Sequence, residues 1–560
     1  MLFCIRKGFS SLFTYRSASE SVVAVPLRFY VRKNTMHTKP PNILVYSRTE
    51  SIKNELVKTL RTVLQGNTYT VYPITEPQVK AKAWPNSTAL LLVHGSIGKG
   101  LADVFLDFFL HGGKLFSICC TEILHRIHCC NSSVRGALFT EHLKDLHGVN
   151  REVYIEVMSR NSTVFSLTAA KSNGRAVLSQ MKLNDVSDSD NKRRLDIFRY
   201  VLSTQLDIRI TESDTTDKLN CETGFLLGDD QCKTNFLAHI NDTTHIPNTL
   251  ETGGLVLQFY SETNVPVVPT PTFHPIWLNR IPKDFSLSDY FDHLKTFLFG
   301  RLAIYLPVVG SSMDIVSTAT LGHGFVVIPR QQTNGVGRNN NQWLSPEGCA
   351  MFSIQLHVPL SSPLGQRLPL VQHLVAIAIV KAIRESGPGY EQLDVRLKWP
   401  NDIYADGVAK LGGSIINSQV QSAEAIVNVG CGLNLSNSTP TVCINDLVQT
   451  FNTRNGTNLP LLRYEQVLAL IFNEIEKLFN EVQCGNLQYL FDLYYKYWLH
   501  QDKPVKMKNE KGSEVTGQIK GIDEYGYLLV MIDNHAKPVC IHPDGNSFDM
   551  MNGLIIPKYF

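Results

Sequence analysis

Short apolar runs alternate with amphipathic helical stretches in the first part of the chain, and this alternation limits the possible folds more than any other feature. Helical patterns at 51–64 and 100–113 separate apolar runs of strand length, which are NILVYS at 42–47, ALLLVHG at 89–95 and KLFSICC at 114–120. Strands that alternate with helices favour a parallel sheet covered by helices. We therefore expect an α/β domain over 39–275 that ends in a polar, proline-stiffened connection.

The pattern changes near Pro275 and again near residue 500. Two stretches, 368–389 and 463–484, carry apolar residues at helical spacing, and strand candidates lie between them: VRLK, GSIINSQV and AIVNVGCGLNL. This order predicts an α+β domain with a mixed sheet over 276–500. Short strand-like runs joined by turns follow, which predicts a small β-barrel over 501–560.

Composition excludes several classes of protein. The 560 residues are 43% apolar, which suits a globular chain of several domains. Lys and Arg number 53 against 50 Asp and Glu, a net charge of +3, so we expect no nucleic-acid partner. The apolar runs fall short of the ~18 residues needed to span a bilayer, so we expect no membrane insertion. Twelve cysteines without a regular framework indicate reduced thiols inside a cell.

The first 38 residues differ from the rest. They are rich in Ser, Arg and Lys, and Glu20 is their one acidic residue, a composition typical of a mitochondrial transit peptide. Met36 lies just before the first strand-like run, so initiation there would produce a chain without the leader. We expect a mitochondrial and a cytoplasmic pool; the alternative is a disordered basic tail.

Four polar, glycine-marked segments fall within about 130 residues of the second domain. They are GSSMD at 310–314, QTNGVGRNNNQW at 332–343, RLKWPNDIYADGVAKLGGSIINS at 396–418 and VGCGLNLSN at 429–437. A Gly-X-Gly sequence alone is most often a turn. Arg338 strengthens the functional interpretation, because a guanidinium on a glycine loop can close over a carboxylate or phosphate.

The third segment carries candidate reactive groups. Asp402 follows a strand, where open-sheet enzymes place reactive side chains, and Asn401 offers a donor and an acceptor beside it. Lys410 precedes Gly412-Gly413, where a ligand can approach the backbone closely. The alternatives are that Asp402 caps a turn and that the lysines are surface residues.

Several segments together resemble the biotin protein ligase family. They are GRNNNQWLSPEGCA, RLKWPNDIY, AKLGGSIINS, VGCGLNLSNSTPTVCINDL and HPDGNSFDMMNG, in the order that the family has them. The similarity covers about Leu302 to Phe560, and the long N-terminal region resembles the eukaryotic holocarboxylase synthetase form. The resemblance implies a catalytic domain of the biotin/lipoate ligase type and an SH3-like C-terminal barrel.

The resemblance also implies an activity. Members form biotinyl-5′-AMP from biotin and Mg²⁺-ATP, and then transfer biotin to one lysine of an apo-carboxylase. Two alternatives are lipoate attachment on the same fold and a non-catalytic scaffold or regulator. Biotin-dependent carboxylases would be the partners, and the oligomeric state, monomer or homodimer, is left open.

The resemblance assigns roles to individual residues. The catalytic residues would be Lys410, Arg338, Asp402 and Lys398. The biotin site would comprise Ser311, Ser312, Met313, Gln332, Gly335, Val336, Gly337, Arg338, Trp343, Lys410, Gly413, Ile415, Gly430 and Gly432. The adenylate would contact Arg338, Asn401, Lys410 and Asn434, and we expect no protein-only metal site.

The glycine loop departs from the family pattern. Members usually have a basic residue where Val336 stands and a small residue after the arginine, where this chain has Asn339-Asn340. The loop therefore carries less positive charge near the phosphate. We expect it to retain the adenylate less tightly.

The first domain resembles the glutamine-amidotransferase-like module of eukaryotic members. Cys119 stands where that fold has its nucleophile, but Ser117 and Thr121 replace the glycines that the turn requires. We expect no amidotransferase activity. The Cys and His residues between Cys119 and Cys130 lack metal-ligand spacing, so we expect buried structural thiols.

Overall fold

The computed structural model describes most of the chain, and these residues fold as helices on sheets. The described ranges are 40–80, 84–127, 135–159, 163–181, 188–211, 221–244, 246–261, 268–338, 341–508, 514–532, 537–543, 546–549 and 554–557. The predicted leader over 1–38, Asn339-Asn340 and the segment His128 to Cys130 lie outside them.

The first sheet has the strand order β2-β1-β3-β4-β8-β7-β6-β5. Its strands are β1 Asn42–Ser47, β2 Thr70–Pro73, β3 Thr88–His94, β4 Lys114–Ile118, β5 Leu138–Lys144, β6 Asn150–Val157, β7 Val164–Ala169 and β8 Arg175–Ser179. Neighbouring strands pair in parallel, as expected, in the first part of this order, which comprises β2, β1, β3, β4 and β8. The remaining strands, β7, β6 and β5, add an antiparallel half that the sequence pattern does not predict.

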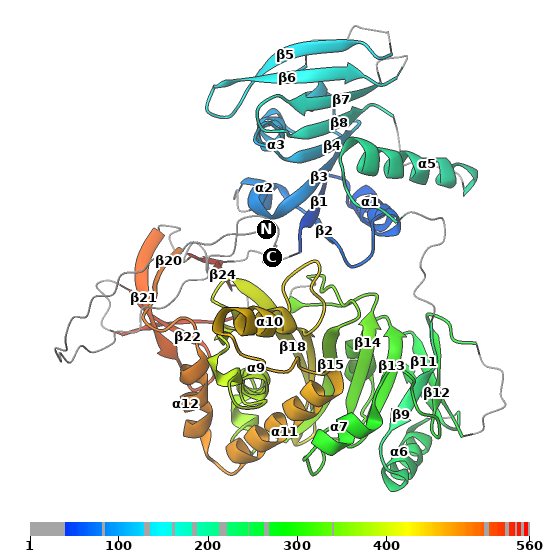
Figure 1. The fold of residues 1–560 in the computed structure, drawn as a ribbon, viewed down its shortest axis with the longest axis vertical. Helices are drawn as coiled ribbons and strands as arrows, with labels where there is room; N and C mark the ends of the chain where they lie inside the picture. Colours follow the sequence, from blue (N-terminus) through cyan, green and yellow to red (C-terminus); the bar gives the residue numbers. More distant parts are fainter. Residues whose placement is uncertain are drawn as a thin grey trace, which may run out of the picture. The chain divides into compact units, whose positions relative to one another are not determined.

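Helices cover both faces of the parallel half (Figure 1). They are α1 Glu50–Val63, α2 Glu76–Lys80, α3 Lys99–Leu110, α4 Thr121–Leu124 and α5 Asp188–Tyr200. Apolar residues of α1 and α5 pack in one core and those of α3 in another. This arrangement follows from strands that bury both faces, such as β3 with LLLV.

The second sheet has the order β10-β11-β12-β9-β13-β14-β15-β19-β18-β17-β16. Its strands are β9 Gly224–Leu227, β10 Thr249–Thr252, β11 Leu255–Tyr260, β12 Phe273–Trp277, β13 Ala303–Val309, β14 Val326–Gln332, β15 Cys349–Pro359, β16 Val395–Lys398, β17 Asp402–Ala405, β18 Ala409–Gln421 and β19 Glu424–Asn434. Pairing is mixed, as expected: β13 and β14 run parallel, and β15, β19 and β18 run antiparallel.

The predicted boundary near Pro275 falls inside β12 of this sheet. Strands β9 to β11 precede that residue and belong to the same sheet as β13. They are short and lie among polar runs, so the sequence shows no periodicity there. The chain therefore leaves the first sheet and enters the second one between α5 and β9.

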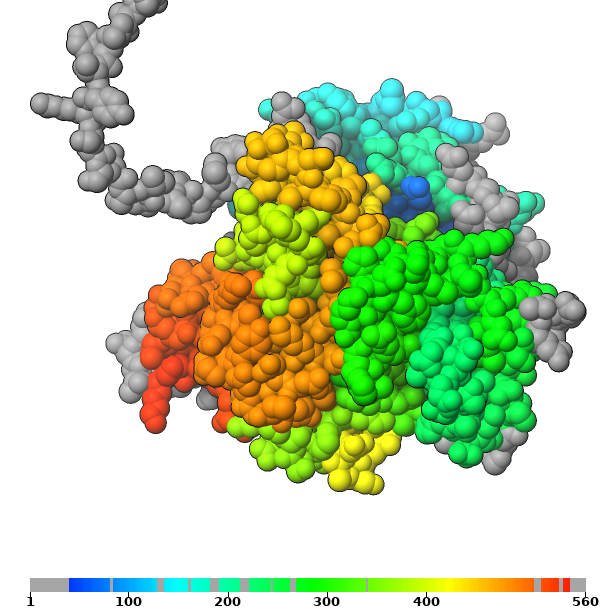
Figure 2. All heavy atoms as spheres, turned by 60° about the horizontal axis from the view of Figure 1, so that its bottom comes forward, coloured from blue at the N-terminus to red at the C-terminus, as the bar shows by residue number. Residues whose placement is uncertain are grey.

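Helices also flank the second sheet (Figure 1). They are α6 Asp230–Thr243, α7 Leu287–His293, α8 Ser312–Thr318, α9 Leu370–Arg384, α10 Ile444–Asn455, α11 Tyr464–Gln483 and α12 Leu487–Tyr497. The helices α9 and α11 match the two long helices predicted from the sequence. Figure 2 shows the orange surface around α11 and α12 beside the green surface around α7.

The third sheet has the order β23-β22-β21-β20-β25-β24 and is mostly antiparallel. Its strands are β20 Pro504–Lys508, β21 Glu514–Ile522, β22 Leu528–Ile532, β23 Val539–Ile541, β24 Asn546–Asp549 and β25 Leu554–Pro557. Val505, Ile519 and Leu528 belong to the same apolar core as α9 and α11. The C-terminal sheet is therefore packed against the central one.

No helix within the described ranges combines the length and apolar character needed to cross a membrane.

Candidate active site

The glycine-bearing segments 333–338 and 341–343 follow the end of β14, pair with each other, and are together called the strap below. Val336 pairs with Gln342 across it, and the Trp343 N–H donates to the Gly335 carbonyl oxygen at 2.8 Å. A Cβ on Gly335 would lie 2.4 Å from the Trp343 carbonyl oxygen, so the close approach of the two strands requires glycine. The two segments of the strap therefore lie close together, side by side.

Arg338 lies at the turn of the strap and bonds to two other parts of the chain. Its Nη1 donates to Asn401 Oδ1 at 3.3 Å, and its Nη2 donates to the carbonyl oxygen of Pro543 at 2.8 Å. Asn401 Nδ2 in turn donates to the Ser414 carbonyl oxygen at 2.6 Å. The strap, the segment after β16 and the C-terminal sheet thus meet at one guanidinium.

Asp402 lies between two lysines at the start of β17. Its Oδ1 is 2.7 Å from Lys410 Nζ and its Oδ2 is 3.4 Å from Lys398 Nζ. Lys410 keeps 28% of its side chain exposed, more than the 15% of Asp402. Lys410 Nζ also lies 5.5 Å from the centroid of the Trp343 ring. The Lys410 ammonium is thus held by Asp402 and covered by Trp343 of the strap, and its exposed part is accessible to a small ligand.

Glycines on β18 and β19 form a flat floor beneath the strap. A Cβ on Gly432 would lie 2.3 Å from Trp343 Nε1, and one on Gly430 would lie 2.6 Å from Met313 Sδ. Side chains at these positions would displace their neighbours. Register pairing places the predicted floor residues opposite one another on the two strands: Gly413 with Gly432, and Ile415 with Gly430.

A buried polar cluster lies at one end of this floor. Gln332 Oε1 accepts from the Ser312 N–H at 2.8 Å and from its hydroxyl at 3.1 Å. Ser312 Oγ is 2.8 Å from Ser353 Oγ, and Ser353 pairs with Gly430 across the sheet. Ser311 is buried beside it. Ser353 is not among the predicted site residues, because it stands inside the apolar run of β15 without a motif to mark it.

A cluster of amides lies at the other end of β19. Asn434 Nδ2 donates to Thr441 Oγ1 at 3.0 Å, and Asn434 Oδ1 accepts from Asn437 Nδ2 at 2.8 Å. All three side chains are buried. Asn437 and Thr441 are not among the predicted site residues, although Asn437 ends the motif VGCGLNLSN.

The turn between β21 and β22 contacts Trp399, close to Asn401 and Asp402, through one carbonyl group. Gly526 O accepts from Trp399 Nε1 and from His373 Nε2, each at 3.0 Å. Gly526 has a φ of +85°, which favours glycine. Burial lowers the pKa of His373 to about 4, so this imidazole is neutral at pH 7.

The structure therefore brings the four predicted segments together. Val336, 37% exposed, and Gly337 lie on the strap itself. In the part of the chain that the structure describes, no three His, Cys, Asp or Glu side chains are grouped to hold a metal ion.

The thiols of the first sheet are engaged by their surroundings. Cys119 follows β4 with a φ of +54°, and its Sγ–H donates to the carbonyl oxygens of Gln180 and Met181 at 3.5 and 3.3 Å. Burial raises the pKa of Cys120 to about 11. A protonated, buried Cys120 fits a structural role.

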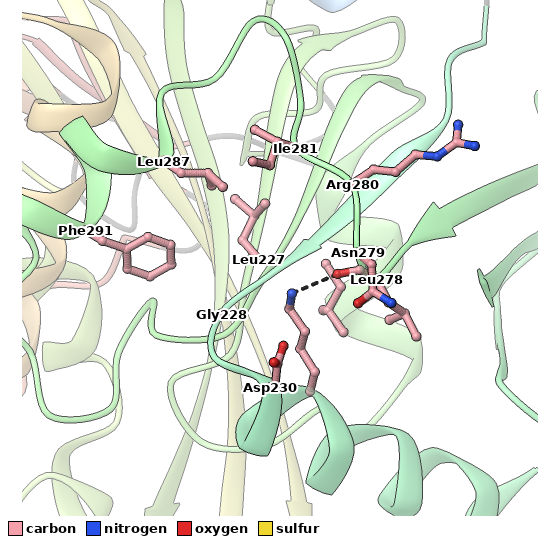
Figure 3. A pocket seen from close by; sticks show the side chains of 11 residues that line it. Leu227, Gly228, Asp230, Leu278, Asn279, Arg280, Ile281, Leu287 and Phe291 are labelled. Atoms are coloured by element: carbon pink, nitrogen blue, oxygen red, sulfur yellow. Dashed lines mark hydrogen bonds between the residues drawn. The ribbon is translucent and has the colours of Figure 1, made fainter. Parts of the chain in front are cut away.

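A separate hollow of about 290 Å³ opens where β9 and β12 end, near α6 and α7 (Figure 3). Leu227, Ile281 and Phe291 contribute apolar side chains to its lining. Lys233 also lines the hollow, and its ammonium donates to the Leu278 carbonyl oxygen at 2.8 Å. The Lys233 ammonium is therefore already bonded to the protein's own backbone.

The chain is similar to known biotin protein ligases. The model of the Biotin/lipoate A/B protein ligase family matches residues 307–434, and that of the Biotin protein ligase C terminal domain matches 500–551. The human biotin–protein ligase is 29% identical over 98% of this chain and 82% of its own length. Biotin–protein ligase 1 of Arabidopsis thaliana is 34% identical over 49% of this chain and 74% of its own length. The chain belongs to the biotin protein ligase family.

Membership in the biotin protein ligase family accounts for the second sheet from β13 onward and for most of the third sheet. The first family model covers the stretch from β13 to β19, and the second covers most of the C-terminal sheet. A biotin protein ligase from Aquifex aeolicus in complex with biotin and ATP aligns with 42% of this chain and 94% of its own, at 21% identity and a TM-score of 0.33.

Proposed function

We propose that this chain is an ATP-dependent biotin–protein ligase. The biotin carboxylate displaces pyrophosphate from ATP to give biotinyl-5′-AMP, and the ε-amine of an acceptor lysine then displaces AMP to leave an amide. The observation that carries this proposal is the convergence of Lys410, Asp402 and Arg338 over a glycine floor, in a chain of this family.

Lys410 and Arg338 stabilise the negative charge of the reacting groups in the first half-reaction. Biotin's carboxylate and the α-phosphate repel one another, and negative charge shifts to pyrophosphate as the P–O bond breaks. Fixed cations aimed at those oxygens stabilise the transition state. Lys410 is held by Asp402 and covered by Trp343. Arg338 sits on the strap, so it folds over the mixed anhydride and keeps water away.

The biotin pocket runs along β19. The uncharged ureido ring needs hydroxyl and amide partners in a buried slot, which Ser311, Ser312 and Gln332 supply. Met313, Ile415 and the floor glycines bound the ring and tail, and Gly335, Val336 and Gly337 form the strap above them. Trp343 closes the pocket over the carboxylate.

The nucleotide occupies the opposite end. Asn434 contacts adenine, and Asn401 and Lys398 lie on the phosphate side with Arg338 and Lys410. Asp402 is the carboxylate at this end, and both of its oxygens face lysines. These side chains therefore do not form a Mg²⁺ site of their own, and Mg²⁺ would enter bound to ATP. Mg²⁺ supplies charge neutralisation on the phosphates when it is bound.

The second half-reaction requires a neutral amine, whose usual pKa is about 10.4. Asp402 is the group that orients the incoming lysine and accepts its proton. Its short contact with Lys410 means that the acceptor amine competes for a carboxylate already engaged by the enzyme.

Polar groups at the head end favour biotin over lipoate. A dithiolane ring would need an apolar slot, whereas Ser312, Gln332 and Ser353 present a hydrogen-bonded cluster there. A scaffold with a lost active site would not need Arg338, Asp402 and Lys410 in contact. Pyrophosphate exchange tests all three functions: biotin should support it, lipoate should not, and exchange with neither would leave only the scaffold.

We propose amidotransferase-like ancestry without amidotransferase activity for the first sheet, and an SH3-like barrel for the last. The acceptors are the biotin-carrier domains of carboxylases, modified by a monomer or homodimer. A mitochondrial pool and a cytoplasmic pool follow from residues 1–38 and from Met36. A fluorescent fusion of residues 1–40 that stays diffuse would remove the mitochondrial pool.

A further inference from the structure

A buried glutamine on β15 joins that strand to the C-terminal end of α8. Gln355 is fully buried. Its Nε2 donates to the carbonyl oxygens of Val316 and Ala319 at 2.9 and 2.8 Å. Its Oε1 accepts from the N–H groups of Leu321 and Gly322 at 2.7 and 3.2 Å. One side chain therefore bonds to four backbone groups at the end of the helix and just after it.

The end of α8 needs such a partner. The last carbonyl groups of a helix have no partner inside the helix, and a buried polar group that is left unpaired costs free energy. Val316 is itself fully buried, so solvent cannot replace Gln355 at its carbonyl group. The glutamine therefore both stabilises the end of this seven-residue helix and fixes it to the sheet.

The strand β15 holds both ends of α8. Ser353 bonds to Ser312 in the first turn of the helix, and Gln355, two residues further along the same face of β15, bonds to Val316. Two residues of a strand span ~6.7 Å, and the four residues from Ser312 to Val316 span ~6 Å of helix. Because the two spacings agree, the helix lies along the strand and is held at two points.

The neighbouring strand β19 takes part in the same support. Asn428 pairs with Gln355 across the sheet, is also buried, and accepts from Gln355 Nε2 at 3.0 Å through its Oδ1. Gly430, two residues further along β19, is the floor glycine that lies against Met313 of α8. The two amides therefore tie the helix to the strands that form the head end of the biotin pocket.

We propose that Gln355 is a positioning residue for biotin: it fixes the C-terminal end of α8 and thereby sets Ser312 and Met313 over the ring of the ligand. The inference rests on the proposed function and deepens it. The backbone groups of α8 and Asn428 engage the amide of Gln355, so Gln355 acts through the helix and not by touching the ligand. A helix that is held in place beforehand binds biotin without a further ordering cost.

The experiment measures biotin-dependent pyrophosphate exchange by the full-length enzyme and by Gln355→Met, which keeps the length of the side chain and removes the bonds of the amide. We expect the KM for biotin to rise about 10-fold or more, while kcat and the KM for ATP stay within about twofold of wild type. A KM for biotin that does not change, or a KM for ATP that rises equally, would overturn the inference.

Asn473→Leu is the matched control, because Asn473 clamps the end of another seven-residue helix, α7. Its Nδ2 donates to the His293 carbonyl oxygen at 2.9 Å, and its Oδ1 accepts from the Lys295 N–H at 2.7 Å. Helix α7 contributes no residue to the proposed pocket, so this variant should keep the wild-type KM for biotin. An equal rise in both variants would overturn the assignment to Gln355.

Hydrogen exchange of the wild-type enzyme tests the inference without a variant. The amides of residues 312–322 should exchange slowly both with and without biotin, because the helix is held before the ligand binds. Fast exchange that becomes slow only with biotin would show that the ligand orders the helix, and would overturn the inference. Absence of pyrophosphate exchange with biotin and ATP would instead refute the proposed function.

Discussion

A substitution at Asp402 should slow the two half-reactions by different factors. Its carboxylate holds Lys410 for adenylate formation and orients the acceptor amine for transfer. Asp402→Asn keeps the shape and removes the charge and the base. We expect single-turnover transfer from preformed biotinyl-AMP to fall about 100-fold or more, and pyrophosphate exchange to fall less. Equal losses in the two assays would contradict a role in proton transfer.

Gly432 tests the floor of the pocket. In Gly432→Ala the new Cβ would lie 2.3 Å from Trp343 Nε1, so the ring must move off the site. We expect the KM for biotin to rise about 10-fold or more, equivalent to roughly 1.4 kcal/mol. Gly100→Ala is the control, because a Cβ there meets nothing within 4 Å. Similar KM values for both variants would refute the close packing inferred for Gly432.

Individual site residues differ in how well the sequence reveals them. Arg338, Asp402 and Lys410 stand in glycine-marked motifs, and the structure brings them together. Ser353 lies in the site because β15 pairs with β19. Asn437 lies there because its side chain bonds to Asn434. A single sequence shows no strand register, so such residues have no mark of their own.

At the scale of an element, the strap should set how long the adenylate is retained. Val336 stands where the family resemblance implies a basic residue, and it is 37% exposed. In Val336→Lys an added charge near the phosphate should slow the release of biotinyl-AMP about threefold to tenfold, the effect of roughly 1 kcal/mol of attraction. Release is measured without acceptor protein.

Val420→Lys places the same charge at an exposed position of β18, outside the strap. It should leave release unchanged. If Val336→Lys also releases the adenylate at the wild-type rate, the missing charge does not govern retention.

Regular elements were predicted better than sheet membership. The apolar runs at 42–47, 89–95 and 114–120 became β1, β3 and β4, because buried parallel strands read as continuous apolar segments. The strands β2, β5 to β15 and β17 were not named from the sequence. Their neighbours in the sheet decide their conformation, since the half-exposed β5 and the four-residue β9 carry weak local signals.

At the scale of the whole molecule, the C-terminal sheet couples stability to pH through His373. Burial lowers the pKa of His373 to about 4, whereas an unfolded chain takes up the proton near pH 6.5. Between these values the unfolded state binds more protons, so stability falls as pH drops from 6.5 to 4, by up to roughly 3 kcal/mol for this group. His323 contributes in the same direction, since burial lowers its pKa to about 4.

His373→Gln removes the titrating group and keeps an N–H that can reach Gly526 O. Thermal midpoints measured from pH 7 to pH 4.5 should fall less steeply for this variant than for wild type. Parallel curves would show that His373 does not control the acid sensitivity.

The most direct test of the account is biotin-dependent exchange of labelled pyrophosphate into ATP by the full-length protein and by Lys410→Ala. The account predicts exchange with biotin and not with lipoate, and a loss of about 100-fold or more in the variant, because a fixed cation at the reacting oxygens is removed. Exchange that depends on lipoate, or that persists at the wild-type rate without Lys410, would contradict it.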